Sequence, residues 1–187
     1  DLKNIPCHVP YLSLPDGHKI DNSLIRKERN KLKVGIVWAG NPINKNDRNR
    51  SCPVSHFIEL GECADVVLFS LQKGSQGQDL SRYRAEGKVV DLSDILNDFS
   101  DTAAALEELD LIITVDTAMA HLAGALGKQV WVLLPFCPDW RWMLCRDDSP
   151  WYPSMQLFRQ SKPGDWRGVF IQVKEALSKM IMKEGIR

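Results

Sequence analysis

The sequence predicts an α/β fold, a three-layer α/β/α Rossmann-like domain in which helices cover both faces of a doubly wound parallel sheet of about six strands. Three observations lead to this prediction. Short apolar runs rich in β-branched residues begin roughly 20 to 30 residues apart. These runs show little polar alternation, which is typical of strands that are buried on both faces. Helical patterns lie between them, so the strands should be joined by right-handed crossovers.

Six runs are predicted to be strands. They are Lys33–Trp38, Val66–Leu71, Lys88–Leu92, Leu111–Val115, Val130–Leu134 and Met155–Phe158.

Four segments have the pattern of helices: Phe57–Glu62, Ser100–Leu109, Thr117–Leu126 and Trp166–Met182. Either Asp98 or Ser100 is expected to cap the second helix, Asp116 should cap the third, and Gly127 should end it. Residues 1–31 are rich in proline and turn residues, so we expect an N-terminal arm or linker from a missing upstream region. Residues 32–187 then form the domain itself.

Composition restricts the possible partners. The 24 Lys and Arg residues balance 24 Asp and Glu residues among the 187, so the chain as a whole does not attract nucleic acid or an anionic membrane. A chain of this length is sufficient for one core but not for a two-domain enzyme. No apolar run is long enough to be a transmembrane segment.

The five cysteines are scattered, and no C-x-x-C pair occurs among them. This pattern indicates neither a disulfide framework nor a zinc site, so we expect no metal. We expect instead small buried or half-buried side chains in a reducing compartment, hence a cytoplasmic protein.

The strand order 3-2-1-4-5-6 would place the ligand site where the winding reverses, between the first and fourth strands. Two loops should face each other there, Ala39–Pro53 and Asp116–His121. At the start of the third helix, the N–H groups of Thr117, Ala118 and Met119 would lack intrahelical partners and favour a phosphate or pyrophosphate. His121, one turn later, could donate to the same anion.

If the helix is considered without the facing loop, a purely structural interpretation is at least as well supported as an anion site. Asp116 would only cap it, and His121 would be a satisfied buried histidine. The facing loop favours the anion site, because Lys45, Arg48 and Arg50 follow one another closely and arginine binds diphosphates bidentately. Alone, such a loop would be interpreted as solvated.

Two further segments should lie at the same edge of the sheet. Gln72 and Lys73 follow the second strand, where Lys73 is either a phosphate or sugar ligand or an ordinary surface lysine. Phe136, Asp139 and Trp140 follow the fifth strand, where aromatic faces suit stacking on a base or a sugar. The alternative is that the aromatic residues anchor an irregular segment, which we expect of at least half of the tryptophans.

Several common signatures are absent from the sequence. No G-x-G-x-x-G follows the first strand, so NAD is not expected, and no Walker A sequence, G-x-S-x-G elbow or H-E-x-x-H pair occurs.

The chain nevertheless resembles a known family over nearly its whole length. The resemblance is carried by VGIVWAGNP (34–42), NDRNRS (46–51), FSLQKG (69–74), the stretch 98–127, LLPFCPDWRW (133–142), DDSPWYPSMQLFRQ (147–160) and PGDW (163–166). These segments are similar to the C-terminal glycosyltransferase domain of bacterial tetratricopeptide-repeat proteins, of the heptosyltransferase type, family 9.

The resemblance implies the C-terminal lobe of a two-lobed GT-B enzyme, which binds the nucleotide-sugar donor. The family motif D-[ST]-G-x-x-H corresponds to Asp116, Thr117 and His121, whose counterparts contact the donor pyrophosphate, and its glycine is Ala118 here. The basic residue of the first loop corresponds best to Arg50. Gln72 and Lys73 have counterparts that reach the nucleotide in the similar lobe of O-linked N-acetylglucosamine transferases.

The hypothesis is therefore a donor-binding lobe of an inverting, metal-independent glycosyltransferase that needs no cofactor beyond its nucleotide-sugar substrate. The catalytic base is expected in an N-terminal GT-B lobe, so no catalytic residue is assigned in this chain, which would be inactive alone. Partners would be that lobe, tetratricopeptide repeats of the same polypeptide, or both. The alternative is a degenerate lobe that serves as a scaffold or interaction module, which Ala118 and the Trp140 and Trp142 patch favour.

Overall fold

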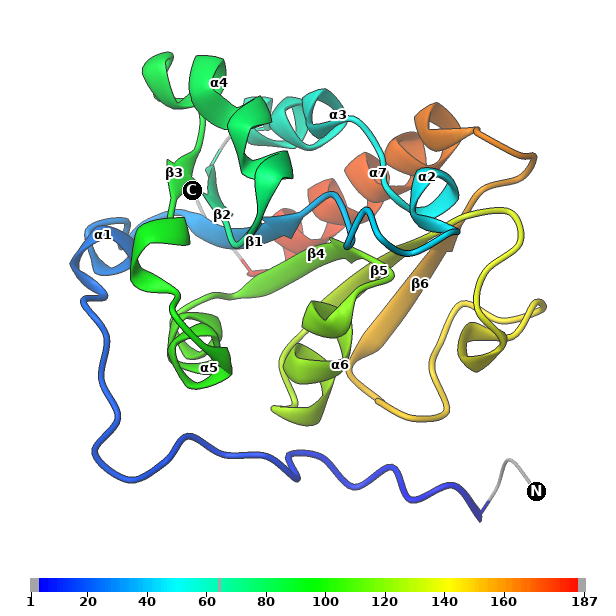
Figure 1. Cartoon of the computed structure of the whole chain (residues 1–187), viewed down its shortest axis with the longest axis horizontal. Coiled ribbons are helices and arrows are strands. Elements are labelled where there is room, and N and C mark those ends of the chain that lie inside the picture. The colour runs from blue at the N-terminus through cyan, green and yellow to red at the C-terminus, as the bar shows by residue number, and fades with distance from the viewer. Residues whose placement is uncertain (1–3, 64, 185–187) are drawn as a thin grey trace.

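The computed structural model describes residues 4–63 and 65–184, and they form a sheet with helices on both faces (Figure 1). All six strands are parallel and their order is β3-β2-β1-β4-β5-β6, so the predicted winding is confirmed. The strands are β1 (Leu32–Val37), β2 (Val66–Ser70), β3 (Val90–Asp91), β4 (Leu111–Val115), β5 (Val130–Leu134) and β6 (Met155–Arg159). Each observed strand overlaps the run predicted for it.

The helices alternate with the strands along the chain. They are α1 (Ser23–Arg26), α2 (Asp47–Arg50), α3 (Val54–Ile58), α4 (Ser81–Ala85), α5 (Phe99–Glu107), α6 (Ala118–Ala125) and α7 (Trp166–Glu184). Short 3-10 helices lie at Glu59–Glu62, Ser75–Leu80, Ser93–Ile95 and Trp140–Trp142. The helix predicted at Phe57–Glu62 is therefore an α-helix that begins earlier and ends in a 3-10 turn.

Each face of the sheet has its own apolar core. Val34 and Ile36 of β1 belong to one core, together with residues of α3 and α7, whereas Val37 belongs to the other, together with residues of α5 and α6. In Figure 1, α3 and α7 lie on one face of the sheet and α5 and α6 on the other. The central strands β4 and β5 are buried at every position. Two buried faces explain why these strands lack polar alternation in the sequence.

The cap of α6 differs from the prediction. Thr117, not Asp116, is the N-cap residue, and its backbone is extended while its hydroxyl makes no capping bond. The Thr117 hydroxyl lies 3.1 Å from that of Thr114 instead. In contrast, the Asp98 cap of α5 is confirmed, because its side chain accepts from the N–H groups of Ser100 and Asp101.

The N-terminal arm lies along α5 and α6 (Figure 1). The N–H groups of Tyr11 and Leu12 both donate to the carbonyl of Ala125 at the end of α6, at 3.0 and 3.3 Å. Near the start of α5, His18 Nε2 lies 2.9 Å from an Asp101 carboxylate oxygen. These contacts attach the arm to the helical layer that also carries the N-terminus of α6.

The cysteines are only partly as predicted. Cys52 is buried and Cys63 half-buried, but Cys7, Cys137 and Cys145 are exposed, because they lie in irregular segments outside the sheet and its helices. Among the helices of residues 4–63 and 65–184, none combines the length and apolar character needed to cross a bilayer.

Candidate functional site

A cleft of about 610 Å³ lies at the carboxyl ends of the central strands, where the winding reverses between β1 and β4. Its walls come from four parts of the chain: the segment after β1, the segment after β2, the start of α5 and the start of α6. The lining residues that matter below are Gly40, Arg50, Gln72, Lys73, Phe99, Thr102, Thr117, Ala118 and Met119. Ligands bind at this point in open parallel sheets, so the cleft is the candidate site.

The N-terminus of α6 forms one wall of this cleft through Thr117, Ala118 and Met119. Because a helix can make no i→i−4 bond in its first turn, the N–H groups there remain available to a ligand. Ala118 is exposed and Met119 half-buried, so this turn is accessible from the cleft. The positive end of the helix dipole makes this wall favourable for an anion.

Arg50 also lines the cleft, and two contacts hold it there. Its Nη1 donates to the carbonyl of Asp116 at 2.9 Å, directly before α6, and its Nε donates to Asp47 Oδ1 at 3.1 Å. The Arg50 and Asp47 side chains are only 16% and 9% exposed. The guanidinium thus connects the loop after β1 to the N-terminus of α6.

Gly40 makes this arrangement possible. A Cβ at Gly40 would overlap both the Arg50 guanidinium and the Asp47 carboxylate. The Gly40 N–H also donates to Ser51 Oγ at 3.0 Å, which closes the loop on itself. Sequence reasoning identified Arg50 but missed Asp47, and the signal was the i,i+3 spacing of opposite charges.

Gln72 lies at the cleft but already has four backbone partners. Its Oε1 accepts from the N–H groups of Trp38 and Ala39 at 3.1 and 3.0 Å, and its Nε2 donates to the carbonyls of Ala39 and Lys73. The side chain is 4% exposed. Gln72 therefore holds the ends of β1 and β2 together rather than presenting a free amide to a ligand.

Lys73 lies at the exposed rim of the cleft, where its Nζ donates to the carbonyl of Ser93 at 2.8 Å. Phe99, at the start of α5, lines the same cleft while 65% of it is exposed to solvent.

His121 does not line the cleft. Its ring stacks on Trp142, with centroids 5.2 Å apart and planes 20° apart, and its Nδ1 lies 3.1 Å from the Tyr152 hydroxyl. Burial lowers the pKa of His121 below its ordinary value, and this effect outweighs the opposite influence of the Asp116 carboxylate. The imidazole is therefore neutral at pH 7, and it packs under the segment that follows β5.

The remaining predicted residues lie outside the cleft lining. Arg48 and Phe136 line a separate cavity of about 260 Å³. Asp139 caps a 3-10 turn by accepting from the Arg141 N–H, and it also pairs with the Arg141 guanidinium at 2.7 Å. Trp140 is 69% exposed, with Arg141 over its ring, whereas Trp142 is fully buried.

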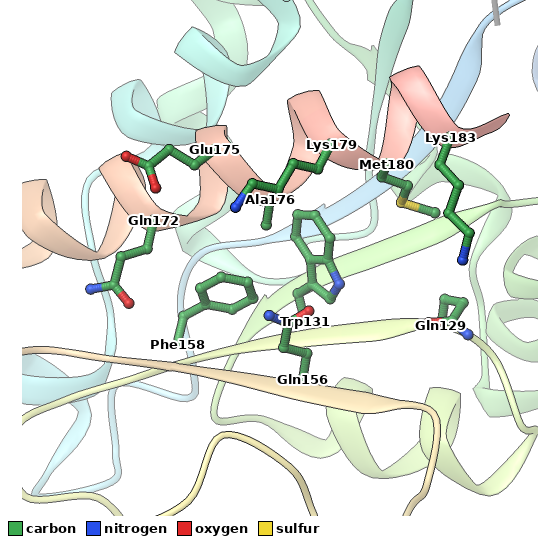
Figure 2. A pocket seen from close by; sticks show the side chains of 10 residues that line it. All are labelled: Gln129, Trp131, Gln156, Phe158, Gln172, Glu175, Ala176, Lys179, Met180 and Lys183. Carbon is green, nitrogen blue, oxygen red and sulfur yellow. The ribbon is translucent and has the colours of Figure 1, made fainter. Parts of the chain in front are cut away.

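A larger cavity of about 690 Å³ lies between α7 and the strands β5 and β6, where Trp131 and Phe158 point toward the helix (Figure 2). Its polar lining consists of glutamines, lysines and one glutamate, and it runs along a face of the sheet. It is therefore not at the carboxyl ends of the strands, where α/β folds bind ligands.

Among the described residues, one cluster brings potential metal ligands within 4.8 Å of one another, namely His18, Asp98 and Asp101. Asp98 already accepts from two N–H groups of α5, and Asp101 accepts from His18 and from the backbone and side chain of Asn97. These bonds explain the cluster as a junction between the arm and α5.

Comparison with known proteins places this geometry in context. No model of a known protein family matches the chain. The protein FlbA of Caulobacter vibrioides is 28% identical over 149 residues, which are 78% of this chain and 25% of FlbA.

Three solved structures share the fold. E. coli ADP-heptose LPS heptosyltransferase II matches with a TM-score of 0.60 at 16% identity, over 93% of this chain and 54% of that protein. E. coli heptosyltransferase WaaC with ADP matches with a TM-score of 0.55 at 16% identity, over 92% and 52%. A family 9 glycosyltransferase from Veillonella parvula matches with a TM-score of 0.52 at 12% identity, over 84% and 49%.

The chain thus has an α/β fold like that of heptosyltransferases, and it spans about half the length of these solved structures. At these identities the likeness concerns the fold, so the activity has to be argued from the site.

Proposed function

We propose that this domain binds the nucleoside-diphosphate sugar of a glycosyltransferase, with the diphosphate in the cleft between β1 and β4. One observation carries the proposal: the N-terminus of α6 and the Arg50 guanidinium meet at the same cleft, joined through the Asp116 carbonyl. A helix N-terminus and an arginine are both groups that bind phosphate. The fold shared with an ADP-bound heptosyltransferase supports the same ligand class.

The cleft also has room for the rest of a nucleotide. Its volume of about 610 Å³ lies within the range of about 300–1,000 Å³ typical of small-molecule sites. Phe99 and Thr102, at one end of α5, form a partly apolar wall on which a base can stack. Lys73 at the rim adds a second cation for the phosphates.

The chemistry proposed for this half is stabilisation of the leaving group. As the bond between the sugar and the diphosphate breaks, negative charge develops on the diphosphate oxygens, and fixed N–H donors and a cation stabilise it. The acceptor and the catalytic base would belong to an N-terminal lobe, with tetratricopeptide repeats as further partners in the same cytoplasmic polypeptide. This chain alone would then bind the donor without transferring the sugar.

Isothermal titration calorimetry with UDP, ADP and GDP tests the proposal. At least one of them should bind, and Ala118→Asp should weaken binding by about 100-fold, because it adds a carboxylate where the diphosphate lies. An acidic residue in the first turn of a helix stabilises the helix, so this variant should still fold. Ala118→Asn, which adds a neutral group of the same size and shape, is the matched control.

The proposal is wrong if none of the three nucleotides binds to the folded chain. It is also wrong if Ala118→Asp and Ala118→Asn bind equally well.

A second function is favoured by a specific observation. Asp47 neutralises much of the charge of Arg50, and Ala118 occupies the position of the family's motif glycine, so the site is less suited to anions than its sequence indicates. A lobe without nucleotide affinity would then act as a scaffold for other proteins. Absence of binding in the titration above would favour this function.

A further inference from the structure

The cavity that contains Arg48 is a second concave site, separate from the nucleotide cleft. It has a volume of about 260 Å³ and lies between α2 and the segments that follow β5 and β6. The two cavities share α2 but have no lining residue in common. Its volume is below the range of about 300–1,000 Å³ for drug-sized ligands, so a single sugar suits it better than a nucleotide.

Arg48 gives this cavity a positive charge. The Arg48 side chain is exposed, and its guanidinium makes no hydrogen bond or ion pair within residues 4–63 and 65–183. The polar neighbours Asn46 and Asn49 are neutral, and no carboxylate belongs to the lining. The cavity is therefore cationic, and among the described residues Arg48 has no counterpart of the Asp47 carboxylate that pairs with Arg50.

Gln160 adds a buried donor. The side chain is 5% exposed, and its Oε1 accepts from the N–H groups of Phe136 and Gly164 at 3.2 and 2.9 Å. These two bonds determine the orientation of the amide, since its oxygen must face both donors. The Nε2 of Gln160 then has no partner within the described part of the chain. Buried donors in native proteins are almost always satisfied, so a missing partner indicates a ligand or a water.

The other wall of the cavity is apolar. Phe136 is 48% exposed, while Trp166 is nearly buried and two prolines, Pro135 and Pro163, complete the wall. A lining that combines apolar side chains with a cation and an amide suits a ring with one C–H face and one charged substituent.

We propose that this cavity binds a monosaccharide-sized ligand that carries one anionic group, either a phosphate or a carboxylate. The anion pairs with Arg48 in the cavity that Gln160 also lines, and the sugar ring packs on Phe136. The proposal goes beyond the nucleotide site, because it assigns a second ligand of different size to different residues.

Protein-observed NMR titration of the chain tests the proposal with three probes: glucose 6-phosphate, glucuronate and glucose. At least one of the anionic sugars should shift the amide resonances of Phe136 and Gly164 at concentrations at which glucose does not. A response to glucose 6-phosphate alone assigns the site to phosphates, and a response to glucuronate alone assigns it to carboxylates.

Two variants and a matched control complete the design. Arg48→Gln should weaken binding by about tenfold or more, while Lys45→Gln, which removes the same charge from the same loop but lines neither cavity, should leave it unchanged. Gln160→Glu keeps an acceptor for both backbone N–H groups but replaces the donor with a carboxylate oxygen, so it should also weaken binding. If a thermal melt shows that Gln160→Glu is unfolded, Arg48→Gln alone decides.

The proposal is overturned if neither anionic sugar shifts these resonances, or if Lys45→Gln weakens binding as much as Arg48→Gln. Failure of the nucleotide site is a separate result, because Ala118→Asp should weaken nucleotide binding and leave the binding of anionic sugars intact.

Discussion

Arg48 and Arg50 are two residues apart in the sequence, yet they enter different cavities and have different electrostatic environments. Arg50 is mostly buried, pairs with Asp47 and is bonded to the start of α6. Arg48 is exposed and faces a cavity with no carboxylate in its lining. The two arginines lie in one four-residue helix, α2, in which residues two apart point in different directions. A run of cations in a loop therefore does not establish a single anion site.

The largest effect should come from removing the amide that holds the cleft wall. Gln72→Leu would leave the N–H groups of Trp38 and Ala39 and the carbonyl of Ala39 buried without partners, so unfolding free energy should fall by about 3 kcal/mol. Chemical denaturation measures this loss. Gln160→Leu is the comparison. It removes the acceptor of two backbone N–H groups at the other cavity, so the loss of unfolding free energy should be smaller. Equal losses would show that the two walls are equally constrained.

Gly40→Ala should weaken ligand binding at the cleft but not at the Arg48 cavity. The added Cβ overlaps Arg50 and Asp47, so we expect a loss of about 2 kcal/mol in stability and about tenfold in nucleotide affinity. The resonance shifts caused by an anionic sugar in the Arg48 cavity should remain as in the wild type. If both ligands lose affinity together, the cavities are coupled through α2 and do not act independently.

Ala118→Gly should have a smaller effect of the opposite sign. Removing the exposed methyl at the first position of α6 permits closer approach of a phosphate, so nucleotide affinity should rise by about threefold. The cost in helix stability is at most about 1 kcal/mol. Calorimetry with the nucleotide that binds the wild type checks this, and unchanged or weaker binding would show that the methyl does not limit the approach.

The smallest effect concerns pH. Burial keeps the pKa of His121 below its ordinary value of 6.5, so the unfolded chain binds this proton more readily than the folded one. Stability should therefore be constant with respect to this group above about pH 7 and should decrease as the pH falls through 6.5 and below. Thermal melts from pH 8 to pH 5 should show a steeper decline for the wild type than for His121→Phe. Parallel profiles would contradict the assignment.

Much of the fold was predictable because of local patterns. The runs LIITV and VWVLL are continuous and apolar, and both are strands that are buried at every position. The alternation of strands and helices predicted the order that the sheet adopts. Local capping was less predictable, since Asp116 and Thr117 are both good N-cap residues and the end of β4 decides between them.

The site was predictable in part. The position of the cleft follows from the strand order, because ligands bind where the winding reverses. The predicted residues that line the cleft include Arg50, Lys73, Thr117, Ala118 and Met119. Whether they bind a diphosphate stays a prediction. His121 was expected on the same face as Thr117, but helical spacing could not indicate that Trp142 and Tyr152, far along the chain, pack against its ring.

The sequence by itself determined the class of fold, because this depends on hydrophobic periodicity and the handedness of crossovers. The common doubly wound strand order, taken with that class, then predicted the edge of the sheet where a ligand can bind. Only the tertiary structure decided that Arg50 is paired with Asp47, whereas Arg48 has no partner among the described residues. It also decided that Gln72 bonds to the backbone, while the amide nitrogen of Gln160 has no partner in the part of the chain that the structure describes. Charge pairing and hydrogen bonding depend on contacts between segments distant in the chain, which no local pattern specifies.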